Sequence, residues 1–220
     1  MKYTTSPTCQ IKDLPAIYEK CFGERPNGHY VEVGAFNGVN WSCSLGLARL
    51  GWKGLLFEPN PEYYVRCVEN YTTYPNVRII PQAVGSYDGT TKLYLGGSNT
   101  TTVPEMVDVY NSMDWSKISG LSHEKFITCP ITTLDTALAL YGWPQHFDLL
   151  VVDVEGAEPD VLWGLSLDYW RVDMMIVETH EKYPDVRLSK KAEEVDALLL
   201  PYGYEKIYAD TINAIYWKSP

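Results

Sequence analysis

The first ligand-binding pattern in the sequence is an acidic residue placed two positions before a glycine. In the run from Tyr30 to Gly38, Glu32 precedes Gly34 at the end of an apolar stretch. Glycine at such a place lets the backbone turn tightly and approach a ligand. Dinucleotide-binding folds carry a second glycine where this chain has Phe36, and a carboxylate at Glu32 would repel a pyrophosphate. The pattern therefore favours a ligand with a cationic amino-acid group.

A second acidic residue, Glu58, ends the next apolar run and is followed by Pro59-Asn60-Pro61. The prolines prevent the strand from continuing and suit the start of a helix. An acidic residue that ends the second strand of a β-α-β unit is in position to bind both hydroxyls of a ribose. The two acidic motifs together indicate a ligand that carries a ribose.

The third pattern is a group of carboxylates that directly follow two later apolar runs in the sequence. Asp153, Glu155 and Glu158 follow one run, and Glu178 and His180 follow the other. Open α/β sheets place their ligands at the carboxyl ends of their strands. Carboxylates beside a buried strand are costly unless they meet a cation, a hydrogen-bond network or water. These side chains are therefore candidates for the chemistry of the protein.

Alternating strands and helices are the elements that must position these groups. Apolar runs of strand length alternate with stretches of helical spacing, and two β-prone segments come last. This order predicts an α/β fold, a Rossmann-like, doubly wound and mostly parallel sheet with an antiparallel edge strand, in a single domain. The expected strands are 29–33, 54–57, 77–80, 147–152, 174–177, 204–208 and 213–217, and the expected helices are 13–22, 42–50, 62–71, 134–141, 159–165 and 189–200.

The chain divides into two expected parts, an amino-terminal helical segment at 1–28 and the main domain at 29–220. The main domain carries an insertion at about 86–130. In it, Asp88-Gly89 predicts a turn into an extra strand, and the sequence is then irregular except for one short helix near Val107. Long loops over a rigid sheet often select ligands, so we expect the insertion to contribute to substrate choice.

Composition argues against two classes of partner. With a formal net charge of −10 over 220 residues, no excess of Lys or Arg is available to neutralise phosphates, so we expect no nucleic-acid partner. No apolar run approaches the ~20 residues that span a bilayer, and the first ten residues lack the pattern of a signal peptide. The five cysteines are widely spaced and form no CxxC pair, as in reduced cytosolic proteins. We therefore expect a cytoplasmic protein without a membrane partner.

Taken together, these motifs resemble those of the FkbM family of S-adenosylmethionine-dependent methyltransferases, over roughly residues 29–217. The resemblance implies that the main domain is a methyltransferase domain whose cofactor is S-adenosylmethionine. It also implies O-methylation of a hydroxyl on a small-molecule, natural-product or carbohydrate acceptor. The matching stretches are 31–38, Leu50-Gly51-Trp52-Lys53-Gly54 with Phe57-Glu58-Pro59-Asn60-Pro61, Asn70, Ala83-Val84-Gly85 with Gly89, Leu134-Asp135, and Asp153-Val154-Glu155-Gly156-Ala157-Glu158.

The same resemblance implies which residues hold the cofactor. Many members of the family carry a lysine two positions before the motif aspartate, and Val151 stands there in this chain. The resemblance implies that Glu32, Gly34 and Gly38 contact the methionine part of the cofactor. It also implies that Glu58 contacts the ribose and that Gln82 and Ala83 contact the adenine.

Two roles are open for the later carboxylates. In one, Asp153 orients the acceptor or the methyl donor, and a neighbouring base removes the hydroxyl proton. His180 is the best candidate for this base, because histidine titrates near neutral pH. In the other, Asp153 and Glu178 hold a divalent cation such as Mg²⁺, which lowers the pKa of the acceptor hydroxyl. We therefore expect the catalytic residues to be among Asp153, Glu178 and His180.

Two other functions compete with methyl transfer. A nucleotide-cofactor oxidoreductase is disfavoured by Glu32 and by the missing second glycine. A non-catalytic binding module could keep the same fold as a scaffold, because a fold alone does not prove an activity.

Overall fold

A computed structural model describes residues 2–113, 125–181 and 186–219, with side chains of the last stretch from residue 190 onwards. A seven-stranded sheet forms its centre, in the order β3-β2-β1-β7-β8-β10-β9. The first five strands in this order are parallel, and β10 runs antiparallel to both β8 and β9. The strands are β1 His29–Val33, β2 Lys53–Phe57, β3 Val77–Ile80, β7 His146–Val152, β8 Arg171–Glu178, β9 Glu205–Ala209 and β10 Asn213–Trp217. The predicted α/β fold with an antiparallel edge is thereby confirmed.

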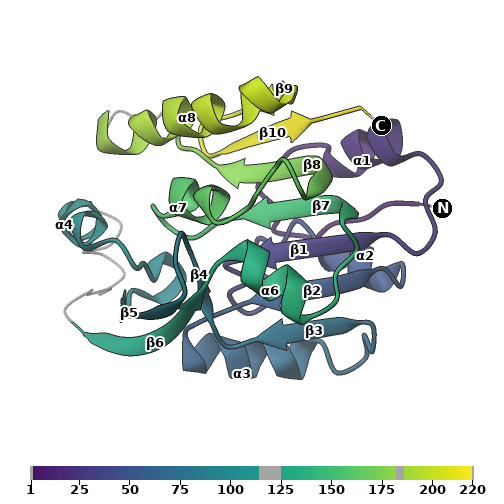
Figure 1. The fold of residues 1–220 in the computed structure, drawn as a ribbon. Coiled ribbons are helices and arrows are strands. Elements are labelled where there is room, and N and C mark those ends of the chain that lie inside the picture. The colour runs from purple at the N-terminus through teal and green to yellow at the C-terminus, as the bar shows by residue number, and fades with distance from the viewer. Residues whose placement is uncertain (1, 114–124, 182–185, 220) are drawn as a thin grey trace.

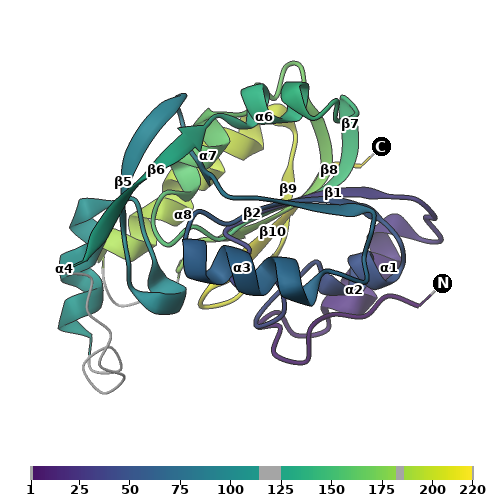
Figure 2. The same cartoon turned by 90° about the horizontal axis from the view of Figure 1, so that it is seen from below.

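Helices cover both faces of this sheet (Figure 2). Successive side chains of a strand point to opposite faces, so each central strand contributes to two cores. Tyr30 of β1 packs with helices α1 to α3, whereas Val31 packs with α6 to α8. The helices are α1 Leu14–Phe22, α2 Leu45–Arg49, α3 Pro61–Asn70, α6 Leu134–Leu140, α7 Glu158–Trp163 and α8 Val186–Leu199, with a 3-10 turn η2 at Leu200–Tyr202.

The amino-terminal segment belongs to the core of the α1 side. Leu14 and Tyr18 of α1 are fully buried, and Tyr3 ahead of the helix is 4% exposed. Tyr3 and Phe22 contact the ring of Trp52, which precedes β2. Residues 1–28 therefore help to support the main sheet rather than lying apart from it.

Residues 83–132 build a second, three-stranded sheet in the order β4-β6-β5. Its strands are β4 Ala83–Val84, β5 Gly89–Tyr94 and β6 Phe126–Thr132, and a 3-10 turn η1 Gly97–Asn99 and helix α4 Pro104–Ser112 lie between β5 and β6. The extra strand after Asp88-Gly89 and the helix near Val107 match the prediction. Strand β6 was not predicted, because periodicity is poor from residue 96 to about 129, and it also contains Pro130, a residue that disfavours a strand interior. The strand tolerates this proline because β4 pairs only with Ile131 and Thr132, which leaves one side of β6 unpaired at Pro130.

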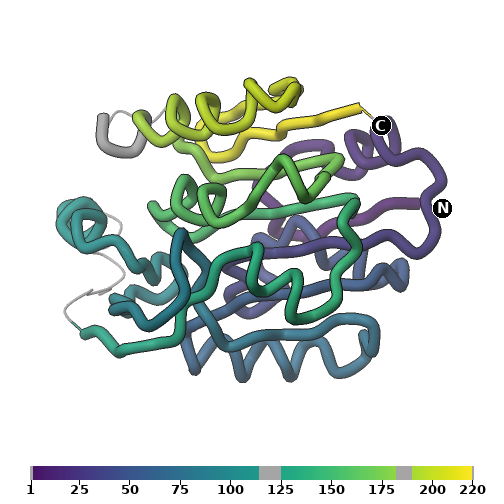
Figure 3. The backbone as a smooth tube through the Cα atoms, in the orientation of Figure 1, coloured from purple at the N-terminus to yellow at the C-terminus, as the bar shows by residue number. Residues whose placement is uncertain are grey.

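The small sheet and α4 lie at the edge where the parallel strands of the main sheet end (Figures 1 and 3). The insertion and the carboxyl ends of the parallel strands therefore face each other, which is the arrangement that a ligand site between them requires. Among the described residues, no helix combines the length and the apolar character needed to cross a membrane.

Candidate functional site

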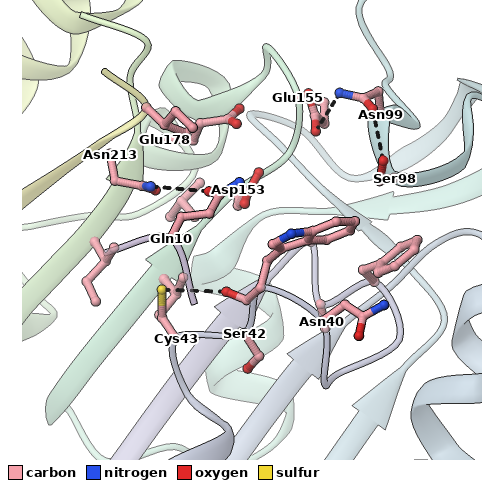
Figure 4. Close-up of a pocket in the computed structure, with 18 of the residues that line it drawn as sticks. Gln10, Asn40, Ser42, Cys43, Ser98, Asn99, Asp153, Glu155, Glu178 and Asn213 are labelled. Carbon is pink, nitrogen blue, oxygen red and sulfur yellow. Dashed lines mark hydrogen bonds between the residues drawn. The ribbon is translucent and has the colours of Figure 1, made fainter. Parts of the chain in front are cut away.

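Two adjoining cavities lie along the carboxyl ends of the parallel strands. The larger has a volume of about 450 Å³ and is lined by the loop after β1, the ends of β7 and β8, and residues of the insertion (Figure 4). The smaller, of about 50 Å³, lies beside the end of β2. The residues that line both cavities are Gly34, Phe36, Ser98, Asp153 and Glu155.

Gly34 is the point where the loops after β1 and β7 meet. Its φ is +86°, and a Cβ there would lie 1.7 Å from the backbone oxygen of Asp153. Only glycine permits this approach. Gly38, also with a positive φ, contacts Tyr71 and Cys67 instead and lines neither cavity. Of the two glycines implied for the methionine part, only Gly34 borders the cavities.

Glu32 is a buried carboxylate in the floor of the larger cavity, only 4% exposed. Ser44 Oγ donates a hydrogen bond to Glu32 Oε2 at 2.7 Å, and Ser42 Oγ donates to Oε1 at 3.3 Å. Burial raises the pKa of Glu32 to about 7, although both serines oppose the shift. The same Ser42 Oγ accepts from the backbone N–H of Leu45, where α2 starts, three residues later than predicted.

Glu58 directly follows the last residue of β2 and lies beside the smaller cavity. Its Oε2 accepts from the N–H of Phe36 at 2.7 Å, and its Oε1 accepts from the N–H of Asn60 at 2.8 Å. Burial raises the pKa of this carboxyl to about 7 as well, against the effect of the two N–H donors. Gln82 and Ala83 line the same cavity. The structure therefore brings together the residues implied for the ribose and the adenine.

Three carboxylates from the ends of β7 and β8 gather at the wall of the larger cavity. One oxygen each of Asp153, Glu155 and Glu178 lies within 4.8 Å of the others. Burial raises the pKa of Asp153 to about 7 and that of Glu155 to about 8, and it holds the pKa of Glu178 well above its ordinary value. Repulsion by the neighbouring carboxylates adds to each shift. The two residues predicted as metal ligands thus lie together, and Glu155 joins them.

Glu155 is held by the insertion. Tyr110 of α4 donates a hydrogen bond to Glu155 Oε2, and Asn99 Nδ2 donates to Oε1 at 3.1 Å. Thr101 Oγ1 donates to the backbone oxygen of Glu155 at 2.7 Å. The backbone of Glu155 has a φ of +57°, which turns its side chain toward these donors and away from a helical path.

Glu158, the fourth carboxylate of this region, is fully buried in an ion pair. Lys191 Nζ of α8 lies 2.9 Å from its Oε2, and the N–H groups of Val154 and Gly156 donate to its Oε1. Burial alone would raise the pKa of Glu158, but the charge of Lys191 and these hydrogen bonds lower it overall. Sequence reasoning missed Lys191, because a lysine in an amphipathic helix is normally a surface residue.

His180 lines the larger cavity, and its Nδ1 lies 3.6 Å from Glu178 Oε2. Burial, followed by the positive charge of Lys191, lowers the pKa of His180 to about 4. The side chain is therefore neutral at neutral pH, whereas the residue type alone suggested titration near neutrality.

Polar residues that sequence reasoning did not assign complete the larger cavity. Gln10 and Asn213 meet there through a hydrogen bond of 3.3 Å between their side-chain amides. Ser42 and Ser44, spaced by two residues after the glycine turn, were a readable signal for a partner of Glu32. Gln10 carried no such signal, because it lies 203 residues from its partner.

Comparisons with known proteins agree with these features. The sequence matches the methyltransferase FkbM domain over residues 32–206. A search of the curated proteins finds no match. The structure is similar to methyltransferase FkbM from Methylobacillus flagellatus KT, with 13% identity and a TM-score of 0.54 over 99% of this chain and 48% of that one. This chain thus spans about half the length of that protein.

A second similar structure is that of a candidate O-methyltransferase from Klebsiella pneumoniae. It has 11% identity and a TM-score of 0.52 over 98% of this chain and 84% of that one. At such identities the structures support the shared Rossmann-like methyltransferase fold, while the match at 32–206 covers most of the sequence. The chain belongs to the FkbM methyltransferase domain family.

Proposed function

We propose that this protein is an S-adenosylmethionine-dependent methyltransferase that methylates a hydroxyl oxygen of a small-molecule or carbohydrate acceptor. The observation that carries the proposal is the cradle at Gly34. There, the loops after β1 and β7 approach so closely that a Cβ on residue 34 would collide with the backbone of Asp153. This close approach lies between the buried carboxylates Glu32 and Glu58. The bound cofactor supplies an electrophilic methyl group on a sulfonium sulfur.

The cofactor site extends across both cavities. Glu32 and Gly34 would hold the methionine part, because a buried carboxylate favours a cationic amino group. Glu58, Gln82 and Ala83 would hold the ribose and the adenine at the smaller cavity. The N–H bonds that fix Glu58 leave its remaining lone pairs for hydroxyl donors. Gly38 would act indirectly, by letting the loop after β1 lie against α3.

The remainder of the larger cavity suits a hydroxyl-bearing acceptor. Side-chain amides and hydroxyls line it, and they can donate to or accept from hydroxyl groups in many orientations. The indole of Trp41 offers a flat apolar surface at the same cavity. The polar lining residues are Gln10, Asn40, Ser42, Ser98, Asn99 and Asn213.

Asp153, Glu178 and His180 are the groups placed to receive the proton of the acceptor hydroxyl. All three line the larger cavity, next to Gly34. His180 is neutral at neutral pH, and a neutral imidazole can accept a proton. A correctly placed general base contributes on the order of 10²–10⁴-fold to the rate, and the alignment of the two substrates contributes most of the rest.

Calorimetric titration with S-adenosylmethionine and its demethylated product tests the proposal. We expect micromolar binding to the wild-type protein and at least tenfold weaker binding to Glu58→Ala. Glu62→Ala, which removes an exposed carboxylate of an i,i+4 pair with Arg66, is the matched control and should bind normally. Absence of binding to the wild type contradicts the proposal. Binding without methyl transfer to any of a panel of hydroxylated acceptors supports a non-catalytic module instead.

A further inference from the structure

We propose that Asp153, Glu155 and Glu178 bind a hard divalent cation of the size of Ca²⁺ in the wall of the larger cavity. Carboxylate oxygens are the ligands that such cations prefer. Asp153 and Glu155 come from the loop after β7, and Glu178 ends the neighbouring strand β8. The three side chains are therefore brought to one point by two adjacent parallel strands.

The carboxylates lie close enough together to share one cation, and the type of ligand favours Ca²⁺ over Mg²⁺. Their oxygens lie within 4.8 Å of one another. Oxygens on opposite sides of Ca²⁺ are separated by about 4.6–5.2 Å, because each Ca–O bond is about 2.3–2.6 Å. The corresponding separation around Mg²⁺ is only about 4.0–4.2 Å. Ca²⁺ tolerates irregular coordination by protein oxygens, whereas Mg²⁺ demands a near-ideal octahedron and gives up its waters reluctantly, so a cluster of protein carboxylates favours Ca²⁺.

Glu178 Oε2 provides an observation independent of the clustering. The residue is only 6% exposed, and among the described residues no donor makes a hydrogen bond to this buried oxygen, since His180 Nδ1 at 3.6 Å is too distant for one. Figure 4 shows the carboxylate of Glu178 directed toward the loop that carries Asp153 and Glu155. A buried polar atom without a partner costs free energy, because its desolvation is not compensated. A cation between the three side chains would supply the missing partner.

The charges around the cluster point the same way. Across the part of the chain that the structure describes, one lysine or arginine side chain forms an ion pair with a carboxylate of this region. It is Lys191, and its partner is Glu158. Within the described ranges, Asp153, Glu155 and Glu178 form no ion pair with a lysine or arginine, although the charge of Lys191 acts on all three. An external cation would relieve the mutual repulsion of these three groups.

Tyr110 and Asn99 are placed to orient one of the ligands. Their hydrogen bonds to Glu155 fix its carboxylate while leaving lone pairs free, as outer partners of metal ligands commonly do. Both residues lie in the insertion, so the insertion would tune cation affinity without contacting the ion.

The role of the cation rests on the proposed function. An ion at this wall would coordinate an acceptor hydroxyl, lower its pKa and hold the oxygen in the cavity shared with the methyl donor, and His180, which is not a ligand, would receive the hydroxyl proton. Vicinal hydroxyls, which can bind one cation together, are the acceptor class that suits this arrangement.

Terbium luminescence provides a direct test, because Tb³⁺ occupies oxygen-rich Ca²⁺ sites and is excited through nearby aromatic rings such as Trp41. The protein is first freed of metal with EDTA. We expect saturable Tb³⁺ luminescence that Ca²⁺ displaces at a concentration at least tenfold lower than Mg²⁺ does. Glu178→Gln should weaken binding at least tenfold, and the surface variant Glu62→Gln should leave it unchanged. Unsaturable luminescence, or equal affinity of Glu178→Gln and the wild type, overturns the proposal.

Two further measurements test the cation site independently and separate it from the proposed function. Ca²⁺ should raise the Tm of the wild-type protein and not that of Glu178→Gln, and an unchanged Tm of the wild type at saturating Ca²⁺ contradicts the site. Titration with S-adenosylmethionine in EDTA separates this inference from the proposed function. Cofactor binding without cation binding disproves the cation site alone, whereas cation binding without cofactor binding disproves the methyltransferase assignment alone.

Discussion

The carboxylates of the two halves of the crevice differ in how completely the protein satisfies them. On the cofactor side, Glu32 and Glu58 each accept two hydrogen bonds from nearby serines or backbone N–H groups. On the acceptor side, Glu178 has a buried oxygen to which no described donor bonds. A carboxylate that is fully bonded is ready to orient a ligand, whereas one that is not still requires a partner from outside.

The hydrogen-bond donors to these carboxylates also lie at different distances along the chain. The donors to Glu32 lie 10 and 12 residues away, and those to Glu58 lie 2 and 22 residues away. Glu155 instead depends on Asn99 and Tyr110, which lie 56 and 45 residues away in the insertion. The donors that hold the cofactor-side carboxylates therefore come from one local β-α-β unit, while those that hold Glu155 come from the insertion. This difference would let acceptor choice change without damage to cofactor binding.

The largest effect is expected where the two halves touch, at Gly34. Gly34→Ala would force a Cβ against the backbone oxygen of Asp153, and we expect loss of S-adenosylmethionine affinity by more than 100-fold. Gly51→Ala is the control, since Gly51 has a φ of +81° but open space around its Cβ position. It should lose only about 1–3 kcal/mol of stability and bind the cofactor normally. Equal affinities of the two variants in calorimetry would contradict the close approach.

A pH effect should mark the cofactor half. Glu32 has a pKa of about 7 when folded, against an ordinary 4.5, so the folded protein retains a proton that the unfolded chain releases. The free energy of unfolding contributed by this group therefore falls as the pH rises from 4.5 to about 7. The slope approaches about 1.4 kcal/mol per pH unit for one proton. Urea unfolding of the wild type and Glu32→Gln should show this difference in slope, and identical slopes would disprove the shift.

The same ionisation should affect the ligand. An ionised Glu32 attracts a cationic amino group, so affinity for S-adenosylmethionine should rise about tenfold between pH 6 and pH 8 for one group of pKa near 7. Glu32→Gln should lose most of this dependence in calorimetric titrations. A variant that keeps the full dependence would assign it to another group, such as Glu58.

A smaller effect is expected from a single donor of the cofactor half. Ser44→Ala removes the 2.7 Å hydrogen bond to Glu32 in a fully buried place, and it should cost about 1–3 kcal/mol of stability. Cofactor affinity should fall with it. Ser86→Ala, which removes an exposed 3.4 Å contact to Asp160, is the control for chemical denaturation. If the two variants lost the same free energy of unfolding, the donors to Glu32 would not be needed for stability.

The smallest effect on the cofactor is expected from the acceptor half. Tyr110→Phe removes the hydroxyl that donates to Glu155, and we expect a loss of about 1 kcal/mol of stability. Affinity for S-adenosylmethionine should change less than in Ser44→Ala, because Tyr110 bonds to Glu155, whereas Ser44 bonds directly to Glu32. Tyr94→Phe, in the small sheet, is the matched control. A stronger effect of Tyr110→Phe than of Ser44→Ala on cofactor affinity would break the distinction between the halves.

The sequence by itself determined the order of the main elements and the edge at which the site lies. Strands at 77–80 and 213–217 were predicted with the observed bounds, because their apolar and β-branched residues carry a local signal. Glu32, Glu58, Asp153 and Glu178 could be placed at one edge for the same reason, since each lies at or directly after the carboxyl end of a parallel strand. Their roles toward cofactor, acceptor and cation stay predictions.

Only the tertiary structure decided the partners and the protonation of those groups. Strand β6 exists through its pairing with β5, and Lys191 reaches Glu158 from a helix 33 residues further along the chain. The neutral state of His180 and the raised pKa values of the carboxylates follow from burial, which no local pattern encodes. Local periodicity specifies which elements form, whereas desolvation and long-range contacts specify what their polar side chains do.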